Sequence, residues 1–230
     1  MKKLFATIAF CSIALGLTAQ ELGTKGGQYL RKDVPEETFR KATMLFDAGS
    51  YHEAEALLQS LIDNKEYKRE AAYLLSLIAF ERNASSSVET LEEYLATYPD
   101  SPNRNHIKSL ILQGLYAQEQ YEIVTGYMHE INPDLLGTED RDNTILAYAM
   151  SLLMTGRSEE AAMQLGILIA ISNRYDTEAN YYIAYTDYLS KRYEEAYDGF
   201  NRTIGQHQSD TRPLWFYKYF YNEEFDPGSG

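Results

Sequence analysis

The strongest constraint on this fold is a sequence phrase that recurs about every 35 residues. A small or β-branched residue near the start of the second half of each unit marks the period: Ala54, Val88, Val124, Ala161 and Ala196. These residues are 34, 36, 37 and 35 positions apart. A unit of this length cannot bury its apolar face alone, whereas stacked units bury a continuous core. The spacing therefore predicts one array of helical repeats.

Each unit is predicted to form a helix hairpin, because apolar residues recur at helical spacing on both sides of a short turn. The first hairpin begins at Pro35, a residue favoured at the first position of a helix, and Gly49 ends its first helix. In the second unit, a polar ASSS stretch is predicted to connect the two helices. The five hairpins are expected at about 35–64, 67–98, 105–133, 142–172 and 177–204.

The residues around the turns resemble the tetratricopeptide repeat family. That family has a small residue in the first helix, a glycine and an aromatic residue at the turn, and an alanine early in the second helix. The matching residues are Ala42, Ala149 and Ala184 in the first helices, Tyr51, Tyr121 and Tyr193 at the turns, and Ala54, Ala161 and Ala196 in the second helices. Small side chains let two helices approach closely while large neighbours fill the adjoining holes. The resemblance implies an all-α fold, a right-handed α-solenoid of about five hairpins with a terminal helix, over residues 35–225.

Residues 1–19 are predicted to be a secretory signal peptide. Lys2 and Lys3 precede an apolar run that ends in small residues at Ala19. The run is shorter than the roughly 20 apolar residues of a membrane-spanning helix, so an uncleaved anchor is the disfavoured alternative. The single cysteine, Cys11, lies inside the run and lacks the residues that precede a lipidated cysteine. We therefore expect an exported protein without a lipid anchor, periplasmic or associated with the outer membrane.

Two further stretches bear on the source and the ends of the chain. The signal and the phrase EYLATYPDSP resemble exported tetratricopeptide proteins of Gram-negative envelopes, and the LTAQ ending resembles signals of Bacteroidetes. Residues 20–34 contain glycine and lack helical periodicity, which predicts a flexible leader. Residues 226–230 are expected to be a disordered tail.

The charge excludes two classes of partner. The sequence has 21 Lys and Arg residues against 34 Asp and Glu residues, a net charge of −13 that becomes −15 once Lys2 and Lys3 are removed. Such a surface repels phosphate backbones and anionic lipid headgroups. We therefore expect no nucleic-acid partner and no docking on a membrane surface. We also expect no transmembrane segment after signal cleavage. The acidity either serves solubility or suits basic partners.

The segment after the fifth unit is unusually aromatic. A helix predicted from Pro213 to Phe225 is apolar nearly all round and includes Trp215, whereas the last helix of a solenoid usually has a polar outer face. Three interpretations stay open: the helix caps the fifth hairpin, the chain is the first part of a longer array, or the helix docks on another protein or on a second copy.

No catalytic, metal or cofactor motif is found in the sequence. The histidines are scattered one to an element and are interpreted as solvated surface residues: His52, His106, His129 and His207. Acidic pairs such as Glu159 and Glu160 fall on second helices, where a solvated face explains them. We expect neither an enzyme nor a protein that holds a metal or cofactor.

Binding is the function that remains. In tetratricopeptide arrays the first helices line the concave groove, and the resemblance places Phe39, Phe46, Tyr73 and Phe80 there. The residues expected to contact a partner are Tyr116, Met150, Met154, Tyr181, Tyr185, Tyr188 and Trp215. Aromatic and methionine side chains supply contact area at low entropy cost, although many of them would instead pack between hairpins.

These residues predict a non-catalytic scaffold of the bacterial envelope that binds a protein or peptide. Two alternatives are a carbohydrate-binding protein and the amino-terminal regulatory part of a larger envelope protein. The lysine and asparagine clamp that some members of the family use for a terminal carboxylate is not matched here, because the corresponding positions carry Phe39 and Thr43, or Tyr181 and Tyr185.

Overall fold

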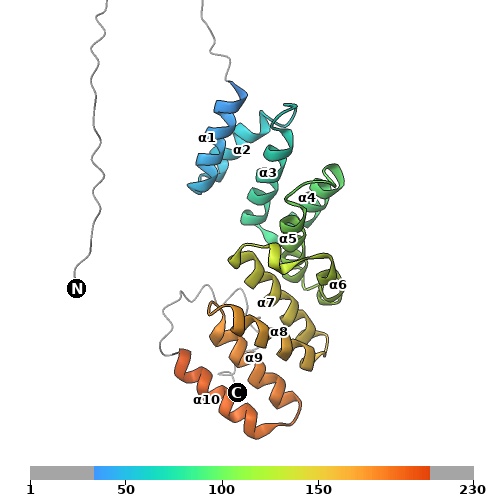
Figure 1. Ribbon diagram of the computed structural model, residues 1–230, viewed down its shortest axis with the longest axis vertical. Helices are drawn as coiled ribbons and strands as arrows, with labels where there is room; N and C mark the ends of the chain where they lie inside the picture. The colour runs from blue at the N-terminus through green and yellow to red at the C-terminus, as the bar shows by residue number, and fades with distance from the viewer. Residues whose placement is uncertain (1–33, 208–230) are drawn as a thin grey trace, which may run out of the picture. The chain divides into compact units, whose positions relative to one another are not determined.

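The computed structural model describes residues 34–207 (Figure 1). Four predicted segments lie outside the described residues: the signal peptide, most of the leader, the helix predicted from Pro213 to Phe225, and the tail. Within residues 34–207 the regular structure is entirely helical, which confirms the predicted fold class. No helix in this part of the chain is both long and apolar enough to span a membrane.

The described helices form five hairpins. Their bounds are α1 (Pro35–Asp47) and α2 (Tyr51–Gln59), α3 (Lys68–Arg82) and α4 (Ala84–Thr97), α5 (Arg104–Ala117) and α6 (Tyr121–Tyr127), α7 (Thr138–Met154) and α8 (Ser158–Ile171), and α9 (Asp176–Leu189) and α10 (Tyr193–His207). Two short 3₁₀ turns, Met128–Glu130 and Pro133–Leu135, follow α6. Each second helix packs on the first helix of the next hairpin, so the five units form one stack (Figure 1).

The turns inside four of the hairpins share one hydrogen-bonded geometry. In the first, the amide of Ser50 donates to the carbonyl of Leu45 at 2.8 Å, across a left-handed residue, Gly49, with φ of 73°. This is the bond pattern of a Schellman motif, which satisfies the free carbonyls at a helix end. The left-handed position is Gly49, Glu119, Gly156 and Lys191 in the four turns. The glycine predicted to end the first helix is confirmed, and two later turns adopt the same conformation without glycine.

The second hairpin differs from its prediction. The ASSS stretch is not a connection, because it is the first turn of α4. Asn83 alone separates the two helices, and its side-chain oxygen accepts a hydrogen bond from the amide of Ser86 at 3.1 Å. Asparagine and serine favour helix starts because their side chains bond free amides there. The polar ASSS run is therefore the first turn of a helix that Asn83 caps, and the predicted connection is wrong.

Small residues bring the helices into close contact, as the sequence predicts. Ala42, Ala149 and Ala184 on first helices are fully buried. A Cβ atom built on Gly199 of α10 would lie 2.6 Å from the Cβ of Ala184 on α9. The two helices therefore pack as closely as their side chains allow.

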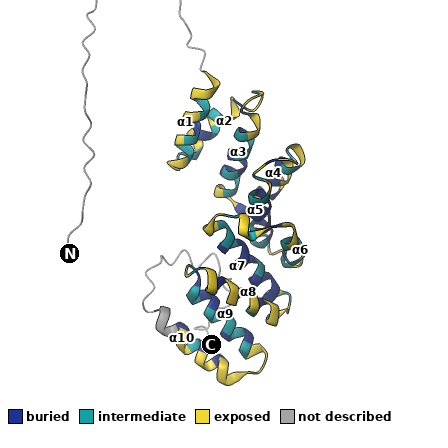
Figure 2. Cartoon of the chain, in the orientation of Figure 1, coloured by how far each residue is buried: buried dark blue, intermediate teal, exposed yellow. Residues whose placement is uncertain are grey.

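The second helices follow the same rule. Ala54 and Ala161 are fully buried and Ala196 is 2% exposed, which confirms their predicted place in the core. Larger buried residues fill the space around the alanines, and Figure 2 shows the buried positions on the sides of the helices that face one another. The described helices therefore bury three successive apolar clusters, and partly buried residues pack against two clusters at once: Tyr73, Leu77, Tyr116 and Met128.

A pair of glycine substitutions tests the close packing of α4 and α5. A Cβ on Gly114 would lie 2.6 Å from Val88 Cγ2 and 2.7 Å from the backbone oxygen of Ala84, whereas a Cβ on Gly166 of α8 meets nothing within 4 Å. Both changes to alanine improve helix propensity by about 0.8–1.0 kcal/mol. We expect Gly166→Ala to stabilise the protein and Gly114→Ala to destabilise it by about 1–3 kcal/mol through overpacking. Urea unfolding followed by circular dichroism measures both, and equal stabilisation by the two variants would contradict this packing.

Candidate functional site

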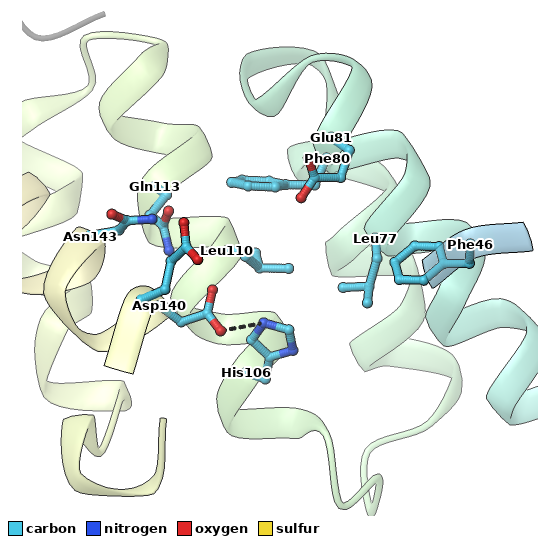
Figure 3. Close-up of a pocket in the computed structure, with 10 residues that line it drawn as sticks. Phe46, Leu77, Phe80, Glu81, His106, Leu110, Gln113, Asp140 and Asn143 are labelled. Atoms are coloured by element: carbon cyan, nitrogen blue, oxygen red, sulfur yellow. Dashed lines mark ion pairs between the residues drawn. The ribbon is translucent and has the colours of Figure 1, made fainter. Parts of the chain in front are cut away.

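A pocket of about 290 Å³ is lined by the first helices of four successive hairpins (Figure 3). We call it the first-helix pocket. Its lining residues are Phe46 from α1, Leu77, Phe80 and Glu81 from α3, His106, Leu110 and Gln113 from α5, and Glu139, Asp140 and Asn143 from α7. Its volume is near the lower limit of ligand pockets, which typically measure about 300–1,000 Å³. The pocket therefore accommodates one or two side chains of a partner.

The walls of the pocket differ in character. In Figure 3 the side chains of Phe46, Leu77 and Phe80 form an apolar wall on α1 and α3. Gln113 and Asn143, with the carboxylates of α7, form a polar wall opposite. A pocket that combines an apolar wall with a few polar groups is typical of a binding site.

His106 links three hairpins at the edge of the pocket. Its Nδ1 lies 2.7 Å from the hydroxyl of Tyr73 on α3, and its Nε2 lies 3.2 Å from a carboxylate oxygen of Asp140 on α7. Because a carboxylate only accepts, a neutral His106 ring donates from its Nε2–H to Asp140 and accepts a hydrogen bond from the Tyr73 hydroxyl at Nδ1. The His106 side chain is 25% exposed. The prediction of a solvated surface histidine is therefore wrong for His106, because both ring nitrogens are engaged.

The electrostatics of the pocket are dominated by carboxylates. Partial burial raises the pKa of the Glu81 carboxyl, and the negative charges of Glu139 and Asp140 raise the same pKa further. Glu139 pairs with Arg174 at 2.5 Å, whereas Glu81 has no hydrogen-bond or ion-pair partner among the described residues. The site therefore holds negative charge that its own side chains only partly neutralise.

The first turn of α7 explains why two of the carboxylates lie here. Glu139 and Asp140 follow the helix start, where the helix dipole and free amides favour negative charge. One turn later, Asn143 accepts a hydrogen bond from the hydroxyl of buried Tyr175. The preference of a helix start for acidic residues thus explains the positions of Glu139 and Asp140. The hydrogen bond from Tyr175 of the next hairpin holds α7 in place.

Within residues 34–207 no group of three His, Cys, Asp or Glu side chains is arranged to hold a metal ion. Nor do the polar groups described above converge on a single free point, because His106 is bonded on both sides and Glu139 is paired with Arg174. The arrangement is suited to contacting a partner's side chains.

The residues predicted to contact a partner lie on the later hairpins. Met150 is 5% exposed and belongs to the core, and Tyr116 is partly buried against the core of two neighbouring hairpins. Met154 and Tyr188 are exposed, at 48% and 53%, while Tyr181 and Tyr185 are half-buried. Tyr181 packs against Phe200 with ring centres 5.4 Å apart. None of the six lines the first-helix pocket, and their role in partner binding stays a prediction, as does that of Trp215, outside the described residues.

Two of the residues placed in the groove by resemblance do line the pocket, Phe46 and Phe80. Tyr73 is not a lining residue, but its hydroxyl is hydrogen-bonded to His106, which lines the pocket. Phe39 lies elsewhere, stacked on Tyr67 with ring centres 5.1 Å apart.

Sequence reasoning missed the polar wall. A signal for it exists, because the polar contacts between hairpins join residues about one repeat apart. Tyr73 and His106 are 33 residues apart, and Asn143 and Tyr175 are 32 apart. The pair Glu139 and Arg174 is 35 apart. Aligning the units on their turns places Glu139 and Arg174 at the same position of the repeat, and Asn143 and Tyr175 three positions apart.

Comparison with solved structures supports the same architecture. A structure of MamA from AMB-1 superposes with a TM-score of 0.61 at 19% identity, covering 79% of this chain and 96% of that one. A MamA double mutant from RS-1 gives 0.62 at 10% identity, covering 77% and 96%. A putative kinesin light chain of Podosopora anserina with nearly identical TPR-like repeats gives 0.53 at 16% identity, covering 78% and 100%.

The chain has a tetratricopeptide-type fold. The five stacked hairpins and the turn residues agree with these neighbours, so the expected resemblance is confirmed at the level of the fold. No protein-family model matches the chain, and no curated protein matches it. In a tetratricopeptide-type array, the first-helix pocket lies on the face made by equivalent helices of successive repeats.

The Tyr73 hydroxyl gives this site a testable pH dependence. Burial, together with the charges of Asp140 and Tyr94, raises the pKa of Tyr73 to about 12. Its contribution to stability is therefore fully present below its unfolded-state pKa of about 10 and is lost as the pH rises through about 12. At pH 8, Tyr73→Phe is expected to destabilise the protein by about 1–2 kcal/mol, because the hydrogen bond to His106 is lost.

Between pH 9 and pH 11.5 the stability difference between the wild type and Tyr73→Phe should shrink. Urea unfolding at each pH measures it, with Tyr197→Phe as the matched control, since Tyr197 is 68% exposed. A difference that stays constant with pH would show that the hydroxyl is not held as described.

Proposed function

We propose that this protein is a non-catalytic adaptor that binds a protein or peptide across its first helices, with the first-helix pocket as the anchor point. The observation that carries the proposal is that one pocket draws its lining from four successive hairpins. Equivalent helices of a repeat array form an extended binding surface of the kind that recognises elongated partners.

The size and lining of the pocket favour a macromolecular partner over a small substrate. A volume of about 290 Å³ holds one or two side chains, so most of a peptide would lie outside it, along the first helices. Buried anchors of this kind supply much of the binding energy of protein interfaces, while the surrounding contacts exclude water. The apolar wall formed by Leu77 and Phe80 is suited to receive such an anchor.

The contacts of His106 support a structural role. One ring nitrogen faces Asp140 on α7 and the other faces Tyr73 on α3, so the ring of this α5 residue joins three first helices. We infer that His106 positions these neighbouring helices.

A specific crosslinking experiment tests the adaptor role. The photoreactive amino acid benzoylphenylalanine replaces Phe80 in the pocket or, as the control, Tyr197, which is exposed on α10. Irradiation of cells that produce each variant should give discrete protein adducts from position 80 and none of the same adducts from position 197. Identical adducts at both positions, or binding of an oligosaccharide with no protein adduct, would contradict the proposal.

We also propose that the adaptor works in the cell envelope after export, on the strength of residues 1–19 of the sequence. The mature protein is expected to begin at Gln20 and to occur in the periplasmic or outer-membrane fraction. Intact-mass measurement of the tagged protein from each cell fraction tests this, and Ala19→Arg should block the cleavage. A full-length chain in the cytoplasm would contradict the location and leave the adaptor role standing.

A further inference from the structure

We propose that the first-helix pocket selects partner segments in which a lysine or arginine lies beside an apolar residue. The basic group meets the carboxylates at the rim, and the apolar residue packs on the α3 wall. This inference rests on the proposed function and specifies the chemistry of the partner.

Carboxylates dominate the charge of the pocket lining. Glu81, Glu139 and Asp140 all line the pocket, and no lysine or arginine is among its lining residues. Asp140 is bonded to His106, and Glu139 is paired with Arg174, which leaves Glu81 as the unpaired carboxylate. A basic group placed near Glu81 would gain from the neighbouring charges that now repel one another, because opposite charges within about 4–6 Å favour the ionised forms of both partners.

An apolar wall lies directly beside the unpaired carboxylate of Glu81. Glu81 follows Phe80 on α3, and Leu77 lies one turn earlier on the same helix, so the unpaired carboxylate borders an apolar surface (Figure 3). Lysine and arginine bury their methylene stems on such surfaces while the charged end reaches a polar partner. A cation close to the Phe80 ring also gains from the negative face of the ring.

The same geometry disfavours other segments. An acidic segment would add a fourth carboxylate to the lining, and a terminal carboxylate would find no lysine or arginine there. A purely polar basic segment would leave Leu77 and Phe80 in water. Charge and apolar contact must therefore occur together in the partner, which distinguishes this site from the general attraction of basic molecules to a chain of net charge −13.

Fluorescence anisotropy with three labelled peptides tests the inference on the purified protein. The first is a ten-residue peptide of alternating lysine and leucine with glycine-serine ends. The second carries glutamate in place of lysine, and the third carries serine in place of leucine. We expect the first to bind at least tenfold more tightly than the other two, and its affinity to fall as salt rises from 50 to 300 mM, because the carboxylate contacts are screened.

Substitutions then place the peptide on the protein. Glu81→Gln should weaken binding of the lysine-leucine peptide about fivefold, the range of a single partly exposed ion pair. Phe80→Ala should weaken it by a similar or larger factor through loss of the apolar wall. The matched controls are Glu93→Gln, an exposed carboxylate on α4, and Tyr197→Ala on α10. Neither control should change the affinity, and circular dichroism verifies that each variant is folded.

The outcomes separate this inference from the proposed function. Equal binding of the lysine-leucine and lysine-serine peptides, or equal weakening by Glu81→Gln and Glu93→Gln, would overturn the inference. Protein adducts at position 80 would still support the adaptor role in that case. Conversely, selective loss of peptide binding in Glu81→Gln, combined with no protein adduct at position 80, would support the pocket chemistry and overturn the adaptor role.

Discussion

The structure depends on the close approach of neighbouring helices at residues with little or no side chain. Gly199 meets Ala184 inside the fifth hairpin, and Gly114 meets Ala84 and Val88 between the second and third. At these points the spacing of the helices is set by backbone and methyl contact, and larger side chains fill the remaining volume. Buried alanines occupy helix positions in the first and fourth hairpins as well, and each hairpin buries its apolar faces against its neighbours. The placement of the first helices, and with it the pocket, follows from this stacking.

Hydrogen bonds in the turns matter more than the residue type that occupies them. Glu119 and Lys191 adopt positive φ angles of 59° and 62°, in the same left-handed position where Gly49 and Gly156 occur. A left-handed conformation costs a non-glycine residue about 1–2 kcal/mol. The bonds that close these turns and the burial of the flanking helices offset that cost. The turn therefore has the same geometry at positions that lack glycine.

The sequence predicts the features that repeat and misses those that join unlike residues. The buried small residues and the turn at Gly49 can be predicted because each depends only on residues close to it in the sequence. His106 was missed because its partners, Tyr73 and Asp140, lie about one repeat away on either side, and a pattern of period 3.6 carries no information on contacts at that distance. The start of α4 was missed for a different reason, since asparagine and serine are common both in loops and at helix starts.

The contacts that sequence reasoning missed are those that connect the candidate site to the stability of the array. The first-helix pocket spans the points where three hairpins are joined by Tyr73, His106 and Asp140, so it keeps its shape only while those units stay stacked. In a repeat array the total stability is approximately a sum of unit and interface terms, and proteins open locally in cooperative units. A partner that contacts α3, α5 and α7 together binds the stacked state and not the opened one, so its binding energy adds to the interface terms. Binding and repeat stacking are therefore coupled through the same helices. A substitution in the contacts among Tyr73, His106 and Asp140, or in the pocket wall, changes both the partner affinity and the stability of the stack.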